Sequence, residues 1–96
     1  MATLPSGTVT FLFTDIEGST KLAQEHPDHW ESMRDRHDAI LKSAIEANNG
    51  HIFQTGGDAF YAGFHTARDA LQAAVQSQLE LAREDWGESP VKVRMG

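Results

Sequence analysis

The sequence predicts an α+β domain, in which one antiparallel sheet carries helices on one face in the split βαβ, ferredoxin-like arrangement. Three observations support this fold class. Runs rich in β-branched and aromatic residues occur near both ends of the chain and in its middle. Amphipathic stretches of helical period separate these runs, and a glycine pair divides the middle one into two strands. The expected order is therefore strand, helix, helix, strand, strand, helix, strand.

The first half of the chain should hold one strand and two helices. Residues 8–14, TVTFLFT, combine β-branched and aromatic side chains and predict a buried strand. A short helix should begin at EGST, with Ser19 or Thr20 as its N-cap. A longer helix should follow and end at Gly50. Its apolar positions recur at helical spacing, through Trp30, Met33, His37, Ile40, Leu41, Ala44 and Ile45.

The second half should hold a hairpin, a helix and a last strand. In residues 51–64, HIFQTGGDAFYAGF, the pair Gly56-Gly57 suits a tight turn between two strands. TARD, residues 66–69, has the form of a capping box and should start the helix. The last strand is expected in VKVRM, residues 91–95. The helix before it should carry one stripe, made of Leu71, Ala74, Val75, Gln78, Leu79 and Ala82.

Composition limits the classes of protein to which the chain can belong. Its 96 residues suffice for one domain with one core, and the absence of cysteine excludes disulfides and thiolate metal sites. A net charge of −6 argues against general binding of nucleic acids, which usually requires a basic face. We expect no signal peptide and no membrane segment in this chain, because no apolar run approaches the roughly 20 residues of a membrane helix. The expected location is cytoplasmic.

Two aspartates are expected to meet at one end of the sheet. Right-handed crossovers place the first strand beside the third, and the two run antiparallel. Asp15 ends the first of these strands and Asp58 opens the other, and adjacent strands lie ~4.8 Å apart. The two carboxylates would repel each other unless a hard cation such as Mg²⁺ or Mn²⁺ lay between them. Two cations could share the pair, as in two-metal phosphoryl chemistry.

The residues after Asp15 favour a phosphate site. The segment IEGST, residues 16–20, opens a helix, and helix N-termini bind phosphate through free N–H groups. Metal carboxylates beside such a segment suit a nucleoside triphosphate, whose charge the protein mainly positions and neutralises. Taken singly, Asp15 could instead be a helix cap and Asp58 a turn residue.

Three stretches of the chain resemble the class III adenylate and guanylate cyclase catalytic domain, particularly its bacterial branch. They are GTVTFLFTDIEGST, RHDAILKSAIEANNGHIFQTGGDAF and VKVRMG, and they span nearly the whole chain. The resemblance implies a homodimeric purine nucleotide cyclase of intracellular signalling, which forms a 3′,5′-cyclic nucleotide and pyrophosphate from ATP or GTP. It implies two Mg²⁺ or Mn²⁺ per site, held by Asp15, Asp58 and the carbonyl of Ile16. It also places the triphosphate on Glu17, Gly18, Ser19 and Thr20.

The chain departs from the family pattern in two ways. The purine-selecting position, usually Lys for ATP and Glu for GTP, is Gln54 here. An amide can donate or accept a hydrogen bond, so either purine could be read, and we favour cAMP over cGMP as product. The second departure is length, because residues 1–96 resemble only the N-terminal portion of the catalytic domain. The remaining portion supplies the second purine contact and the transition-state Asn and Arg, so this fragment should be inactive alone.

Two other interpretations stay open. GGDAF, residues 56–60, differs by one residue from the GGDEF hairpin of diguanylate cyclases. Against this, Ala59 stands where that hairpin has Glu, and EGSTKL lacks the expected Phe-Lys pair. The other alternative is a non-catalytic module that binds nucleotide or dimerises, since a fold does not guarantee an activity.

Overall fold

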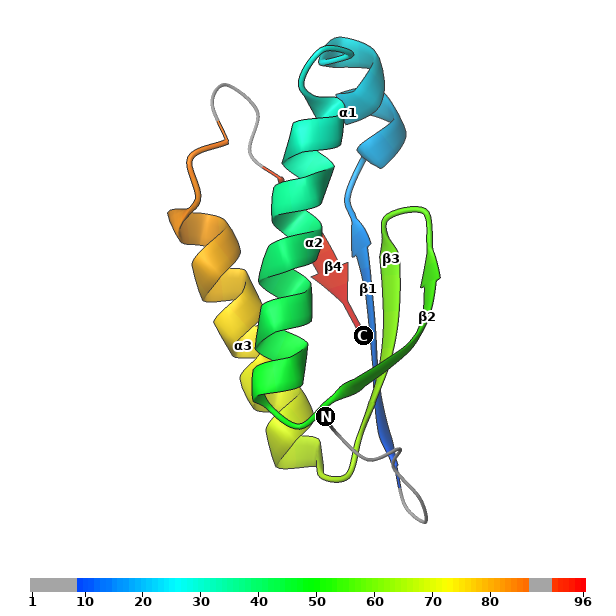
Figure 1. Ribbon diagram of the computed structural model, residues 1–96, viewed down its shortest axis with the longest axis vertical. Coiled ribbons are helices and arrows are strands. Elements are labelled where there is room, and N and C mark those ends of the chain that lie inside the picture. Colours follow the sequence, from blue (N-terminus) through cyan, green and yellow to red (C-terminus); the bar gives the residue numbers. More distant parts are fainter. Residues whose placement is uncertain (1–8, 87–90) are drawn as a thin grey trace.

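The computed structural model describes residues 9–86 and 91–96, and confirms the predicted order of strands and helices. Four strands form one antiparallel sheet, and helices α2 and α3 lie together over one of its faces (Figure 1). Within the described residues no helix is both long and apolar enough to cross a membrane. The elements are β1 (Thr10–Ile16), α1 (Ser19–Glu25), α2 (Trp30–Ala47), β2 (His51–Gly56), β3 (Ala59–Phe64), α3 (Ala67–Arg83) and β4 (Val93–Met95).

Strand β1 lies inside the sheet, whose order is β2-β3-β1-β4. It pairs antiparallel with β3, as predicted, and antiparallel with β4 on its other side. Its buried residues alternate with more exposed ones, as a strand with one covered face requires. Leu12, Thr14 and Ile16 point to the helices, so Phe13 and Asp15 point to the uncovered face of the sheet.

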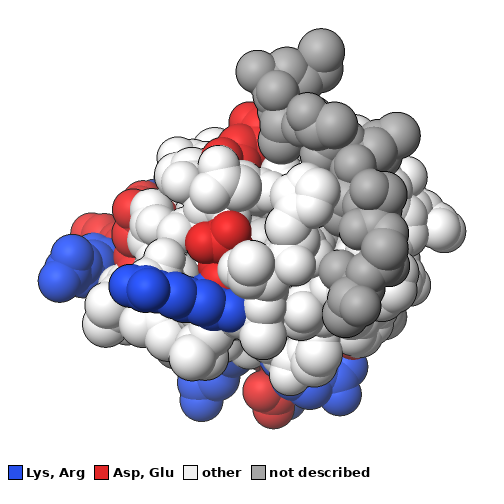
Figure 2. Space-filling view, turned by 90° about the horizontal axis from the view of Figure 1, so that it is seen from below, with Lys and Arg blue, Asp and Glu red and all other residues white. Residues whose placement is uncertain are grey.

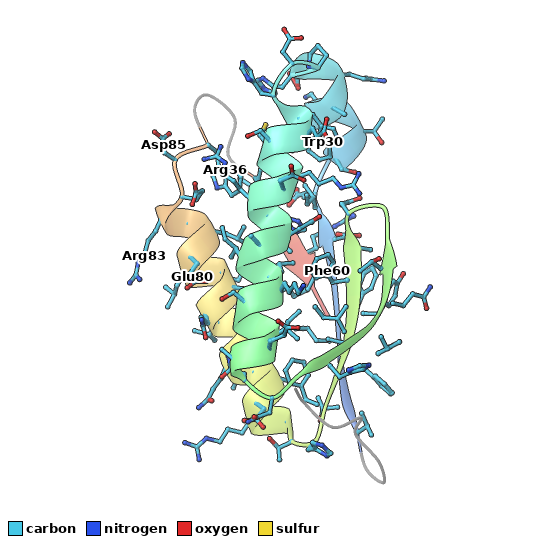
Figure 3. All side chains as sticks on the ribbon, in the orientation of Figure 1. Trp30, Arg36, Phe60, Glu80, Arg83 and Asp85 are labelled. Atoms are coloured by element: carbon cyan, nitrogen blue, oxygen red, sulfur yellow. The ribbon has the colours of Figure 1, made fainter. Side chains whose placement is uncertain are left out.

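Helix α2 buries the stripe that its sequence predicts. Met33, His37, Leu41, Ala44 and Ile45 are all buried. The His37 ring is completely enclosed, lies 5.8 Å from the ring of Phe60 and has Nδ1 2.8 Å from Asp38 Oδ1. Figure 3 shows Phe60 between the sheet and α2. This stripe therefore joins the helix layer to the sheet.

Arg36 connects α2 to the end of α3. Its guanidinium donates to Glu84 Oε1 at 2.7 Å and to the carbonyl of Asp85 at 2.9 Å. It also lies 4.9 Å from the centre of the Trp86 ring, and Figure 3 shows Arg36 turned toward Asp85. These contacts hold the two helices together at the end of the molecule where α2 begins.

The expected role of Gly50 as the helix stop was wrong. Helix α2 ends at Ala47, and Asn49 is the residue that takes the left-handed conformation, with φ 64°. Asparagine tolerates this conformation because its short polar side chain hydrogen-bonds locally. Gly50 is required for a different reason, since a Cβ there would lie 2.5 Å from the Phe64 ring. The glycine thus lets the chain pass close to the core.

Helix α3 begins as predicted but turns another face to the core. The hydroxyl of Thr66 accepts a hydrogen bond from the amide of Asp69 at 3.1 Å, as the first half of a capping box does. Three members of the predicted stripe, Leu71, Val75 and Leu79, are exposed by 65%, 50% and 51%, whereas Ala74 is partly buried and packs against the core. The buried residues are mostly small, which lets α3 pack closely against α2 and β1; they are Ala70, Ala73, Ser77 and Leu81.

The end of the molecule where α3 begins has a mixed surface. Viewed from below, acidic and basic side chains lie interspersed among uncharged ones (Figure 2). On the part of this view that the described residues form, neither sign makes a continuous patch. This end is distant from the end of β1, which lies toward α1 (Figure 1).

We expect Gly50→Ala to lower the free energy of unfolding by about 1–3 kcal/mol, because the added methyl group would collide with Phe64 and Ile45. Urea denaturation of both proteins would measure the change. The matched control is Gly56→Ala, where an added Cβ meets nothing within 4 Å, so its effect should stay within about 0.5 kcal/mol. Equal losses in the two variants would contradict this explanation.

Candidate functional site

The end of β1 and the turn between β2 and β3 are joined by one hydrogen bond. The amide of Ile16 donates to Asp58 Oδ2 at 2.7 Å. Asp58 lies in the turn just before β3, after Gly57 with its left-handed φ of 60°, and not within the strand as expected. The bond therefore brings the Asp58 carboxylate to the peptide link between Asp15 and Ile16.

The Asp15 carboxylate is held by a residue that the sequence analysis did not identify. Arg94 on β4 donates from Nε to Asp15 Oδ1 at 2.9 Å and from Nη2 to Oδ2 at 3.0 Å. The hydrogen bonds and the charge of Asp15 raise the pKa of Arg94, and the charges of Glu17 and Asp58 act in the same direction. Asp15 and Arg94 are directly opposite each other on β1 and β4, a pairing that only the register of the sheet reveals.

The segment after β1 leads into α1, and its cap differs from the prediction. Gly18, with φ 65°, is the N-cap of α1, so neither Ser19 nor Thr20 caps the helix. Glycine takes this conformation without steric cost. The first-turn amides of a helix, here those of Ser19 and Thr20, have no partner inside it. The amide of Glu17, in contrast, donates to the carbonyl of Lys92 at 2.7 Å.

A pocket of about 410 Å³ joins α1 to the turn that carries Asp58. Figure 3 shows Trp30 at the start of α2, near α1 and the end of β1. Arg34 also lines the pocket and adds a cation that the sequence analysis did not single out. Asp15 is not among the lining residues. They are Ser19, Thr20, Ala23, Gln24, Trp30, Arg34, Gly57 and Asp58.

Gln54 lies apart from this cluster. It is exposed on β2, opposite Tyr61 of β3, and β3 separates β2 from β1. The register shifts between Ile52 and Gln54, so Phe53 is the extra residue of a bulge. Within this chain the structure therefore does not bring Gln54 together with the two aspartates.

Aromatic rings cover much of the uncovered sheet face. Phe11, Phe13 and Phe53 are exposed by 66%, 38% and 50%. Phe53 lies 5.8 Å from Phe11 and 6.4 Å from Tyr61, and Phe13 lies 5.0 Å from Tyr61. Exposed apolar surface of this kind is typical of contact with another molecule. Asp15 belongs to the same face.

The available oxygen atoms fit a divalent cation that is also bound by its substrate. In the part of the chain that the structure describes, no group of three or more acidic or histidine side chains could hold a metal by itself. Asp15, Asp58 and the carbonyl of Ile16 are hard oxygen donors, and Mg²⁺ commonly uses one or two carboxylates plus phosphate and water.

Comparison with known proteins identifies the family. Residues 1–95 match the family described as the Adenylate and Guanylate cyclase catalytic domain. An adenylate cyclase of Schizosaccharomyces pombe is 37% identical over 82 residues, which are 85% of this chain and 5% of that protein. The receptor-type adenylate cyclase GRESAG 4.3 of Trypanosoma brucei brucei is also 37% identical over 82 residues, covering 7% of its length. The chain thus spans a small part of these relatives.

A solved structure of adenylate cyclases from Trypanosoma brucei, described in their monomeric state, has the same fold. It superposes with a TM-score of 0.89 at 25% identity, over 97% of this chain and 56% of that chain. The four-stranded sheet with its helices on one face is therefore the architecture of the cyclase domain. The chain belongs to the adenylate and guanylate cyclase catalytic domain family.

Proposed function

We propose that this chain provides the metal- and triphosphate-binding portion of a purine nucleotide cyclase. The observation that carries the proposal is the bond from the Ile16 amide to Asp58, because it brings the Asp58 carboxylate to the peptide that follows Asp15. The match of residues 1–95 to the cyclase catalytic domain supports the reaction class. Residues 1–96 would be the N-terminal portion of that domain, in agreement with their coverage of 56% of the solved trypanosomal chain.

The proposed reaction closes a ring within one nucleoside triphosphate. The 3′-oxygen forms a bond to the α-phosphorus, and the bond from that phosphorus to the oxygen bridging the β-phosphate breaks. Pyrophosphate leaves with the bonding electrons, and the 3′-hydroxyl proton passes to solvent. Two Mg²⁺ or Mn²⁺ ions, when bound, would neutralise phosphate charge and favour the ionised 3′-oxygen.

Asp15, Asp58 and the carbonyl of Ile16 are the proposed metal ligands. Asp58 uses Oδ2 to accept the Ile16 amide, which fixes the orientation of its carboxylate and leaves Oδ1 for a cation. Such fixed placement is the main contribution of a protein to phosphoryl chemistry, since charge must be neutralised where it develops. Both aspartates would act by holding charge in place.

The residues after β1 would hold the triphosphate. Ser19 and Thr20 line the same pocket as Asp58, and their first-turn amides, which have no partner inside the helix, would donate to phosphate oxygens. Gly18 has nothing within 4 Å of its missing Cβ, so a phosphate could approach its backbone closely. Glu17 is also proposed to belong to the triphosphate-binding segment, although its own amide already donates to the carbonyl of Lys92.

The purine and the partner belong to the same proposal. We favour ATP over GTP, with Gln54 at the purine edge, and we favour a homodimer in which a second chain completes the site. The exposed rings of Phe11, Phe13 and Phe53 support a protein contact on the sheet face that carries Asp15. This fragment would be inactive by itself, and the complete cyclase would act in intracellular signalling from the cytoplasm.

In the complete domain, we expect Asp15→Asn or Asp58→Asn to lower turnover at least about 100-fold, because each removes a charged metal ligand while keeping the side-chain shape. Mass spectrometry of products, with Mn²⁺ and either ATP or GTP, would measure this. Asp69→Asn, a partly exposed aspartate in the first turn of α3, is the matched control and should keep its activity.

The same product analysis distinguishes the alternatives. Cyclic AMP or cyclic GMP from the wild type supports the proposal, and full activity in either aspartate variant overturns the site. Cyclic di-GMP would instead indicate a diguanylate cyclase. Nucleotide binding without any product would indicate a non-catalytic module.

We expect Gln54→Lys to raise the ratio of kcat/KM for ATP over GTP by roughly tenfold, because lysine can only donate a hydrogen bond whereas glutamine can also accept one. Parallel kinetics with the two nucleotides would give the ratio. Gln72→Lys, an exposed position on α3, should leave the ratio unchanged. The assignment of Gln54 to the purine site fails if both variants give the wild-type ratio.

A further inference from the structure

Arg94 already occupies the carboxylate that the proposed metal site requires. Its planar guanidinium engages both oxygens of Asp15, at 2.9 Å and 3.0 Å. Two parallel hydrogen bonds make such an arginine–carboxylate pair more directional than a contact through one bond. A divalent cation that approached Asp15 would meet both its bound oxygens and a second positive charge.

The sheet fixes this pairing. Asp15 and Arg94 are directly opposite each other on β1 and β4, and cross-strand partners share one face. Val93, the preceding residue, is buried, so the alternation of β4 sends Arg94 to the uncovered face with Asp15. Placement of the guanidinium on Asp15 is thus a consequence of strand register.

The pair can open without disturbing the core. The Arg94 side chain is 65% exposed and that of Asp15 is 25% exposed. Exposed ion pairs contribute little net stability, because solvent screens them and the side chains lose freedom when they pair. Arg94 could therefore turn into solvent while β4 and β1 stay paired.

We propose that Arg94 is a counter-ion of Asp15 that competes with the divalent cation, so that metal binding requires the Arg94 side chain to withdraw. This inference rests on the proposed metal site. Arg94 acts through Asp15 as a positioning residue, and it sets how tightly the site takes up a cation. The charges of Glu17 and Asp58 also favour the protonated Arg94 that pairs with Asp15.

The test measures the binding of Mn²⁺ alone to the 96-residue chain. The electron paramagnetic resonance signal of free Mn²⁺ falls as the ion binds, and it therefore gives the affinity. Arg94→Gln should bind Mn²⁺ roughly two- to fivefold more tightly than the wild type, the range that measured strengths of exposed ion pairs imply. Arg94→Lys keeps the charge but loses the planar fork, so its affinity should lie between the two. If only the net charge of the side chain mattered, Arg94→Lys would bind Mn²⁺ with the same affinity as the wild type.

Two further variants separate the possible failures. Arg68→Gln removes the same charge from the first turn of α3, far from the end of β1 (Figure 1), and should leave Mn²⁺ affinity unchanged. Asp15→Asn should abolish Mn²⁺ binding. If Asp15→Asn does so while Arg94→Gln leaves the affinity at the wild-type value, the counter-ion role is overturned and the metal site stands. If neither the wild type nor Arg94→Gln binds Mn²⁺, both are overturned.

A second measurement follows Arg94 directly. In the wild type, added Mg²⁺ should shift the NMR signal of the Arg94 Nε–H as its bond to Asp15 opens, while the corresponding Arg68 signal stays in place. Mg²⁺ that binds to the chain without moving the Arg94 signal would also overturn the competition.

Discussion

The hydrogen bond from the Ile16 amide to Asp58 is the contact on which the site depends. It exists only because β1 and β3 pair in one register, in which Thr14 lies opposite Phe60. That register is fixed by burial, since Leu12, Thr14 and Ile16 must all point to the helices. A slip of one residue would turn these side chains outward and send Asp15 into the core. The apolar contacts that fold the sheet therefore also place its acidic groups.

Three acidic residues, Asp15, Glu17 and Asp58, lie around Arg94 at the end of β1. The charges of Asp15, Glu17 and Asp58 all favour the protonated form of Arg94, so they act together on one cation. Carboxylates gathered in this way repel one another, and the chain relieves the repulsion with a side chain from a neighbouring strand. In the proposed function the same negative charge would attract a divalent cation, and that cation would in turn neutralise the phosphate groups of the nucleotide. The Asp15 carboxylate would thus serve both the ion pair with Arg94 and the proposed binding of a cation.

Sequence reasoning was most successful where a single pattern decided the outcome. The order of elements, the buried stripe of α2 and the meeting of β1 with the hairpin all follow from hydrophobic period and topology. It was wrong for α3, because the largest apolar side chains defined the predicted stripe whereas close packing selected small ones, Ala73 and Ser77. It also assigned the helix stop to Gly50, because a glycine's need for space and its need for positive φ look the same in a sequence.

Arg94 could not be identified in the same way, because its role depends on a pairing between distant strands. The β1–β4 register is a tertiary property, and it places Asp15 and Arg94 on the face opposite the helices. The two faces of the sheet consequently have different roles. The covered face packs its fully buried Phe64 against α2, whose Leu41 and Ile45 are also fully buried, and this burial stabilises the domain. The uncovered face carries exposed rings and the Asp15–Arg94 pair. In the proposed function side chains there would change partner, from arginine to metal or from solvent to a second chain, without disturbing the packing of the core.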